Sequence, residues 1–286
     1  MEHDASADRA PLTAPGFRAR KGGTPLVCVT AYDAPFARLA EQAGVDAILV
    51  GDSLGPNVLG YDRELRTTVG DVVHHAAAVT RAASIPLVIG DLPFMSFAAI
   101  PDALQNAACL VQDGGVAAVK IEGGLGVVGV TKGLVSHGIP VMAHVGLTPQ
   151  FVHAMGGYRV QGIDQRGAQQ VVDDALAQEA AGAFAIVLEA IPARLAAELT
   201  RRLSIPTIGI GAGPDCDGQI QVIHDLLGLA GRPPPRHAQR YVDAADAIHN
   251  ALVRYGEDVR CGDFPGAAHG FKIRRGVIDQ LSFDRR

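Results

Sequence analysis

The strongest constraint on the fold is a repeated pattern, in which a short apolar run ends in an ionisable side chain and a helix-like segment follows. One such run is residues 184–188, which leads into Glu189, with Pro192 shortly after. Apolar runs of this length are typical of strands buried on both faces, and proline is frequent in the first turn of a helix. Glu189 is therefore predicted to lie where a parallel strand ends.

Four other apolar runs end in the same way, and their last ionisable residues are Asp52, Asp91, Glu122 and His144. In parallel α/β folds, ligands bind outside the carboxyl ends of the strands. These four side chains and Glu189 are therefore expected to face a single site.

Strand-like and helix-like segments alternate along most of the chain. Strands are predicted over residues 25–30, 46–51, 86–91, 116–122, 140–145, 184–189, 206–210 and, more weakly, 221–226. Helices are predicted over residues 34–43, 68–83, from 101 onward, 164–181, 195–203 and 242–255. Strict alternation predicts a parallel sheet, and eight strands in one domain favour a closed (β/α)8 barrel over an open Rossmann sheet.

The length of the chain alone allows one or two domains, but a single barrel of about 250 residues is an ordinary size. The chain has 286 residues, 48% of them hydrophobic, which is enough for one large core. Residues 1–22 contain acids and prolines but no apolar segment of a signal peptide or anchor, so a disordered N-terminal tail is expected. Residues 23–270 are assigned to the (β/α)8 barrel catalytic domain, and residues 271–286 to a C-terminal tail.

Charge and cysteine content argue against several kinds of partner. The net charge is −5 without a long basic block, which argues against nucleic acid. No apolar run approaches the roughly 18 residues that cross a bilayer, which argues against a membrane. The four cysteines form no C-x-x-C pair, so neither a zinc knuckle nor a disulfide framework is predicted, and a cytoplasmic location is expected. The substrate is therefore expected to be a small molecule.

Alternation along the fourth strand places two polar side chains on one face. Lys120 and Glu122 should point into the mouth of the barrel, next to Asp52 and Asp91. Carboxylates gathered in a partly desolvated cavity repel one another, and a single lysine cannot neutralise three of them. A hard divalent cation would neutralise the remaining charge. Ligation by oxygen atoms alone favours Mg²⁺ or Mn²⁺ over zinc. The sequence therefore predicts a metal site formed by Asp52, Asp91 and Glu122.

Glu189 and His144 are the remaining ionisable strand ends. A carboxylate that lies near a cation without ligating it is suited to be a general base, and this role is predicted for Glu189. His144 is either a site residue or a barrel-mouth histidine bonded to a backbone carbonyl. Structural roles are expected for four residues without a recognisable partner: His74, His75, His224 and Asp225.

Residues 124–129 match the dinucleotide-binding pattern G-x-G-x-x-G and follow a predicted strand. The acidic residue that would bind a ribose about 20 residues further on is missing, because residues 146–149 read Gly-Leu-Thr-Pro. NAD binding is therefore not expected. The connection over residues 146–163 is too long for an ordinary loop, and its length and glycines suggest a lid.

Several motifs, in order along residues 24–270, resemble the ketopantoate hydroxymethyltransferase family. They are Thr30-Ala31-Tyr32-Asp33, Val50-Gly51-Asp52-Ser53-Leu54-Gly55, Asp91-Leu92-Pro93-Phe94-Met95, Val119-Lys120-Ile121-Glu122-Gly123-Gly124, His144-Val145-Gly146-Leu147-Thr148-Pro149-Gln150, Gly156-Gly157-Tyr158, Ile208-Gly209-Ile210-Gly211-Ala212-Gly213 and Asp217-Gly218-Gln219. Departures from the family pattern are Gly126 and Gly129, and residues 264–269, which lack the acids common there.

The resemblance implies a (β/α)8 TIM barrel of the phosphoenolpyruvate/pyruvate type, one Mg²⁺ per subunit and a homodecamer. It also implies transfer of a one-carbon unit from the co-substrate 5,10-methylenetetrahydrofolate to 3-methyl-2-oxobutanoate, giving 2-dehydropantoate in pantothenate biosynthesis. Asp52, Asp91 and Glu122 resemble metal ligands, and Glu189 resembles the catalytic proton acceptor. The residues that resemble substrate-binding positions are Asp52, Ser53, Asp91, Lys120 and His144.

Elementary chemistry agrees with this activity. A 2-oxo acid can chelate Mg²⁺ through its keto and carboxylate oxygens, which stabilises the enolate formed when Glu189 removes the C3 proton. Two alternatives remain. A carbon–carbon lyase of the isocitrate-lyase kind shares this chemistry, but it relies on a lid cysteine, and residues 146–163 contain none. The other alternative is a non-catalytic barrel that serves as a binding or scaffold subunit. The complete set of acids at the strand ends argues against it.

Overall fold

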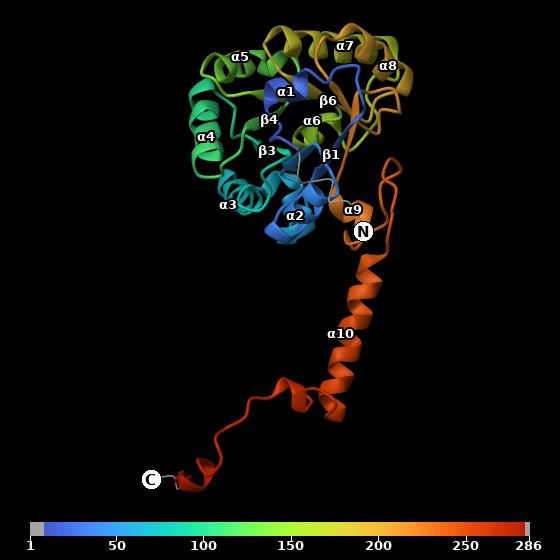
Figure 1. The fold of residues 1–286 in the computed structure, drawn as a ribbon. Coiled ribbons are helices and arrows are strands. Elements are labelled where there is room, and N and C mark those ends of the chain that lie inside the picture. Colours follow the sequence, from blue (N-terminus) through green and yellow to red (C-terminus); the bar gives the residue numbers. More distant parts are fainter. Residues whose placement is uncertain (1–8, 284–286) are drawn as a thin grey trace.

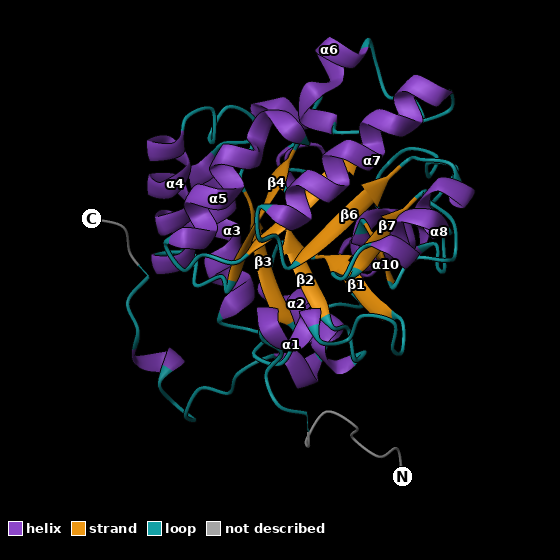
Figure 2. Cartoon of the chain, turned by 90° about the horizontal axis from the view of Figure 1, so that it is seen from above, coloured by secondary structure: helices purple, strands orange, loops and turns teal. Residues whose placement is uncertain are grey.

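The computed structural model describes residues 9–283, and its centre is a closed barrel of eight parallel strands. Each strand pairs with the next along the chain, and β8 pairs with β1. Helices surround the strands (Figure 2). The predicted (β/α)8 barrel is confirmed. Its strands are β1 (Leu26–Thr30), β2 (Ala47–Val50), β3 (Leu87–Asp91), β4 (Ala118–Glu122), β5 (Val141–Gly146), β6 (Ala185–Glu189), β7 (Thr207–Ile210) and β8 (Gly218–Gln221).

The helices α2, α3, α7 and α8 begin and end close to the predicted residues, and α4 begins close to its predicted start, whereas no bounds were predicted for α5 and α6. At the start of α3, the backbone N–H of Thr68 donates to Asp71 Oδ2 (2.9 Å) and that of Asp71 donates to Thr68 Oγ1 (3.2 Å), a capping box. The loop of residues 211–217 joins β7 directly to β8. The barrel helices are α2 (Ala34–Gln42), α3 (Val69–Thr80), α4 (Ile100–Gln112), α5 (Val128–Ser136), α6 (Val152–Met155), α7 (Gln165–Ala180), α8 (Ala193–Arg202) and α9 (Ile223–Leu227).

The eighth strand lies earlier in the chain than predicted. The predicted strand over residues 221–226 is wrong, because most of it coincides with the short helix α9. Gly218 in β8 lies so close to β1 that a Cβ atom would be 2.5 Å from the backbone oxygen of Leu26. β8 has only one apolar residue and therefore gives no strand signal in the sequence. The apolar residues that follow it do give such a signal, which explains the wrong prediction. One of these, Ile223, is buried between the barrel and its helices.

The N-terminal segment closes the bottom of the barrel through α1 (Ala14–Arg18). Phe17 is fully buried, and its ring packs edge-on against Phe184 with centroids 5.8 Å apart. Arg20 and Lys21 form ion pairs with acids of the barrel, at 2.6 and 2.7 Å. The helix α1 and the two ion pairs thus hold this part of the predicted tail against the barrel. The sequence gives no sign of it, because one buried aromatic in a short helix produces no periodic pattern. Residues 1–8 lie outside the described residues.

The side chains of β4 show how the barrel separates its core from its site. Val119 and Ile121 point outward into the apolar layer under the helices, and Ala118 points into the barrel. Lys120 and Glu122 line the cavity at the open end, as the alternation predicted. The same strand therefore serves the core with one face and the site with the other.

The helix α10 (Ala244–Cys261) projects away from the barrel, and the C-terminal segment follows it further out (Figure 1). Every residue of α10 is at least partly exposed. The helix begins near the predicted start and extends beyond the predicted end at residue 255. Among the described helices, none combines the length and apolar composition needed to cross a membrane.

Candidate active site

The carboxyl ends of the strands surround a cavity of about 480 Å³. The structure brings together there all five ionisable strand ends singled out from the sequence, together with Lys120 and Ser53. Their convergence follows from the parallel barrel, in which every strand ends on the same side. The five strand ends are Asp52, Asp91, Glu122, His144 and Glu189.

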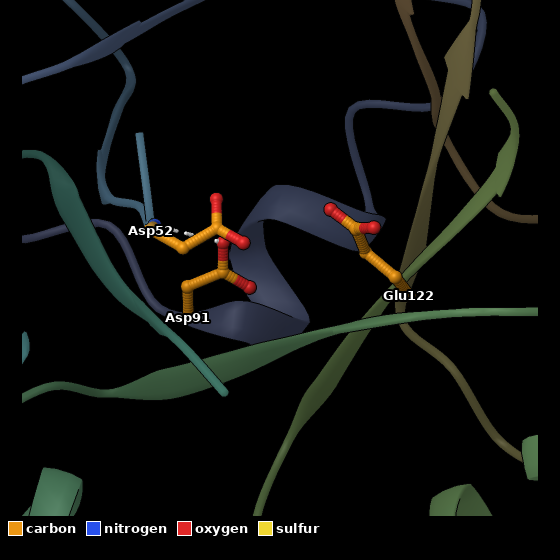
Figure 3. Close-up of side chains that lie close together, drawn as sticks. All are labelled: Asp52, Asp91 and Glu122. Atoms are coloured by element: carbon orange, nitrogen blue, oxygen red, sulfur yellow. Dashed lines mark hydrogen bonds between the residues drawn. The ribbon is translucent and has the colours of Figure 1, made fainter. Parts of the chain in front are cut away.

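Three carboxylates form a compact cluster on one side of this cavity. One oxygen from each of Asp52, Asp91 and Glu122 lies within 4.8 Å of the others, and all three residues are buried. Figure 3 shows the Asp52 and Asp91 side chains next to each other, with Glu122 facing them from another strand. The backbone N–H of Asp52 donates to Asp91 Oδ2 (3.2 Å). The cluster therefore joins the ends of β2, β3 and β4.

Lys120 neutralises only part of this cluster. Its Nζ donates to Asp91 Oδ2 (3.0 Å) and to Glu122 Oε1 (3.1 Å). Burial would raise the pKa of Glu122, but the charge of Lys120 and the contact with His144 outweigh it and lower this pKa to about 2. Asp52 does not share in the pairing, and burial together with the charges of Asp91 and Glu122 raises the pKa of Asp52 well above its usual value.

The donor set fits a hard divalent cation. Three buried carboxylates with one ammonium leave negative charge uncompensated, and the raised pKa of Asp52 is its consequence. Oxygen donors alone suit Mg²⁺ or Mn²⁺, and the cavity beside them leaves room for water or substrate. A cation among the three acids would compensate the charge that Lys120 leaves.

His144 connects this cluster to Glu189. Its Nδ1 lies 3.5 Å from Glu122 Oε1, and its Nε2 lies 3.2 Å from Glu189 Oε2. Burial and the charge of Lys120 would lower the pKa of His144, but the two glutamates raise it to about 9. The neighbours of the imidazole are therefore carboxylates of the cavity, and they favour its charged form.

Glu189 lies outside the cluster, on a rigidly held strand end. The backbone N–H of Leu147 donates to the Glu189 carbonyl (2.9 Å), and the N–H of Ala190 donates to the carbonyl of Ile210 (2.9 Å). Gly146 is required there, because a Cβ atom would be 2.3 Å from the Glu189 carbonyl oxygen. The Glu189 side chain is 14% exposed, against 1% for Glu122. This carboxylate is therefore the more accessible to a ligand in the cavity.

Two supporting residues were not recognised in the sequence. Gln150 donates from Nε2 to Asp52 Oδ2 (2.9 Å) and from its backbone N–H to Glu122 Oε2 (3.0 Å). It thereby holds two of the three clustered acids from the connection that was predicted to be a lid. Tyr32 places its hydroxyl 2.8 Å from Ser53 Oγ. Both residues belong to the quoted motifs, but their partners are defined only by the folded barrel.

The G-x-G-x-x-G stretch has a packing role at its first glycine. A Cβ atom on Gly124 would be 1.8 Å from Cγ of Asp174 in α7. Asp174 accepts a hydrogen bond from the backbone N–H of Leu125 (2.8 Å). The close approach of α7 therefore explains the glycine without a dinucleotide.

Residues 12–267 match the family described as ketopantoate hydroxymethyltransferase. The chain belongs to this family. Two relatives, both named 3-methyl-2-oxobutanoate hydroxymethyltransferase, support the assignment along nearly the full length. The protein from Pelobacter propionicus is 52% identical over 247 residues, which cover 86% of this chain and 91% of that protein. The protein from Thermus thermophilus is 50% identical over 259 residues, covering 91% and 99%.

Two solved structures at low sequence identity share the fold of this chain. Phosphoenolpyruvate phosphomutase from Streptomyces platensis superposes with a TM-score of 0.61 at 17% identity, covering 90% of this chain and 92% of that one. A 2,3-dimethylmalate lyase described as a PEP mutase/isocitrate lyase superfamily member gives a TM-score of 0.58 at 18% identity, covering 95% and 93%. These similarities establish the barrel type.

Proposed function

We propose that this chain transfers a hydroxymethyl group from 5,10-methylenetetrahydrofolate to 3-methyl-2-oxobutanoate and yields 2-dehydropantoate for pantothenate biosynthesis. The activity is that of the family to which the chain belongs. The observation that carries the proposal is the buried cluster of three carboxylates with Lys120 and Glu189 beside it in one cavity.

Asp52, Asp91 and Glu122 would hold one Mg²⁺ per subunit. When bound, Mg²⁺ supplies a Lewis acid that stabilises negative charge on the oxygens of the oxo acid. Lys120 and Ser53 line the cavity next to this cluster, and they bind the carboxylate of the oxo acid through an ammonium and a hydroxyl donor. His144, which lies next to both glutamates, fixes the orientation of Glu189 relative to the substrate.

Glu189 is the general base. Its carboxylate removes the proton from C3 of the oxo acid, and the C–H electron pair becomes the enolate. The enolate carbon forms a bond to the methylene carbon of the folate. At the same time, one of the two bonds between this methylene carbon and the folate nitrogens breaks. Water supplies the hydroxyl group when the second carbon–nitrogen bond breaks, and tetrahydrofolate leaves. The proton taken up by Glu189 and the second proton of the water go to the two folate nitrogens, so the Glu189 carboxylate is regenerated and each bond formed is matched by one that breaks.

The decisive experiment measures tetrahydrofolate release from 5,10-methylenetetrahydrofolate, with and without 3-methyl-2-oxobutanoate, in Mg²⁺ and then in EDTA. We expect release only when both the oxo acid and the metal are present. If no tetrahydrofolate is released but deuterium enters C3 of the oxo acid in a metal-dependent way, the chain removes the C3 proton but does not use the folate. That result would reject the proposed transfer. Release in EDTA at the same rate would reject the metal site.

We also propose that the chain forms a homo-oligomer, for which the resemblance implies a decamer. The support is α10, an 18-residue helix that leaves the barrel (Figure 1). It exposes a row of large apolar side chains. These side chains recur at helical spacing on one face, as in a helix that packs against a partner. They are Ile248, Leu252, Tyr255 and Val259, between 46% and 64% exposed.

A further inference from the structure

One wall of the cavity has no role in the reaction described above. The three clustered acids come from β2, β3 and β4, and in the closed barrel β7 and β8 lie on the other side. The unassigned wall is formed by the ends of these two strands, α9 and the segment that follows α9. Its lining residues are Ile210, Gln221, Asp225, Arg232, Pro235 and His237.

Asp225 is the outstanding residue of this wall. It is only 4% exposed and yet lines the cavity. Its Oδ1 is fully buried and has no hydrogen-bond partner within the described part of the chain. The guanidinium of Arg232 comes no closer than 3.5 Å and is half exposed. Because buried carboxylate oxygens are nearly always hydrogen-bonded, Asp225 lacks a donor that a ligand could supply.

Other acids at the cavity mouth do not share this property. Glu64 Oε2 accepts a hydrogen bond from the Tyr158 hydroxyl (2.7 Å), so it already has a donor. Asp62 also lines the cavity but is exposed to solvent. Among these three acids, Asp225 alone is both buried and in need of a donor.

In the proposed reaction, the side of the cavity at β7 and β8 is free for the second substrate. The oxo acid must lie between the acid cluster and Glu189, which ends β6. The one-carbon unit has to reach the carbon that Glu189 deprotonates. A co-substrate that approaches from the β7 and β8 side meets this requirement, and it passes along the wall that contains Asp225.

We propose that Asp225 binds the 2-amino-4-oxopteridine ring of the folate co-substrate. This inference rests on the proposed function. The ring presents two adjacent donors, N3–H and the 2-amino group, and a carboxylate offers two acceptor oxygens at matching spacing. Ile210 and Pro235 on the same wall provide apolar surface for a flat ring. Arg232 remains near the carboxylate without occupying its hydrogen-bonding sites.

The test measures equilibrium binding to the full-length protein by calorimetry under anaerobic conditions. The ligands are tetrahydrofolate and an analogue with a methyl group in place of the 2-amino group. The variants are Asp225→Asn and, as matched control, Asp62→Asn, a second acid that lines the cavity. We expect Asp225→Asn to bind tetrahydrofolate roughly tenfold more weakly or worse, because the amide presents a donor to one of the ring donors. Asp62→Asn should bind it like the wild type.

The analogue separates ring recognition from a structural role of Asp225. Wild type should bind the analogue roughly tenfold more weakly than tetrahydrofolate, whereas Asp225→Asn should discriminate much less. If wild type binds both ligands equally, the proposal is overturned even where the variant fails to fold. Unchanged affinity in Asp225→Asn, with a lowered Tm, would make the residue a structural partner of Arg232 only. A wild type that binds no tetrahydrofolate would overturn the proposed function as well.

Discussion

Among the carboxylates at the strand ends singled out from the sequence, Glu189 is the one that faces the cavity without belonging to the acid cluster. We expect Glu189→Gln to lower turnover by roughly 100-fold or more, the scale of general-base catalysis, because the amide cannot accept the C3 proton. Affinity for Mg²⁺ and for the oxo acid should stay near that of the wild type. Single-turnover kinetics and calorimetry on the same preparation check both expectations. Loss of oxo-acid affinity would instead assign Glu189 to substrate binding.

Gln150 supports the proposed metal site from outside. Gln150→Leu keeps the approximate size of the side chain but removes the donor to Asp52, so the carboxylate loses its fixed orientation. We expect Mg²⁺ affinity to fall by about 10- to 100-fold, as for partners that orient metal ligands. Calorimetric titration with Mg²⁺ measures this change.

A matched control comes from the same connection. The Gln161 side chain donates only to the carbonyl of Arg159 (2.8 Å), so Gln161→Leu should leave Mg²⁺ affinity unchanged. Equal losses in both variants would indicate a general disturbance of residues 146–163, and equal retention would show that Gln150 does not orient the acids.

Some residues of this site can be predicted from the sequence, and others cannot. Asp52, Asp91 and Glu122 follow apolar runs, and parallel strands bring such ends together whatever the details of packing. Gln150 has no such pattern, because its partners lie on strands remote in sequence. Asp225 was assigned a structural role because it had no recognisable partner, and the strand wrongly predicted over residues 221–226 hid its position in α9.

At the scale of elements, α1 shows how a short segment contributes to the barrel. Phe17 fills the bottom against Phe184 and is fully buried. We expect Phe17→Ala to lower the free energy of unfolding by about 3–5 kcal/mol, because the lost ring leaves a cavity. Urea-induced unfolding measures the change. The control Phe271→Ala removes an exposed ring and should have little effect; a comparable loss there would contradict the assigned role of α1.

The turn between β7 and β8 is held by a carboxylate with a lowered pKa. Burial would raise the pKa of Asp217, but hydrogen bonds from Lys21, Thr207 and Gly22 outweigh it and lower this pKa. A folded pKa below the unfolded value of about 4 gives stabilisation that is complete above pH 4 and is lost as the pH falls through the folded value.

We therefore expect Asp217→Asn to reduce the free energy of unfolding at pH 7 by about 1–3 kcal/mol, with a difference from wild type that shrinks in acid. Urea unfolding measured between pH 7 and pH 3 provides the comparison. Asp215→Asn, an exposed acid of the same turn, serves as control. A constant difference at all pH values would mean that ionisation of Asp217 does not contribute.

Seven of the eight strands were predicted within two residues of their observed bounds, because each carries its own apolar signal. β8 does not: it is a strand because β1 and β7 provide its hydrogen-bonding partners on both sides. Sequence patterns therefore identify strands that contain an apolar run of their own. They miss a strand that forms only because closure of the barrel places it between two other strands.

For the whole molecule, the barrel and α10 differ in how much of their apolar surface a single chain can bury. The barrel buries its strands within a single chain, whereas α10 is about 27 Å long and has no buried residue. A helix of this kind gains little stability by itself, since helices in proteins depend mainly on packing of an apolar face. A second copy of the chain supplies such packing in the proposed oligomer.

Substitution on the apolar face of α10 tests this proposal. Leu252 is 64% exposed in the single chain, and Leu252→Glu would place a charge in the middle of the proposed contact. We expect the variant to sediment as a smaller species than wild type in analytical ultracentrifugation, because burying an unpaired carboxylate costs several kcal/mol. Asn250→Glu puts the same charge on the opposite side of the helix and should leave the assembly intact. An unchanged sedimentation coefficient for Leu252→Glu would place the contact between subunits elsewhere on the barrel.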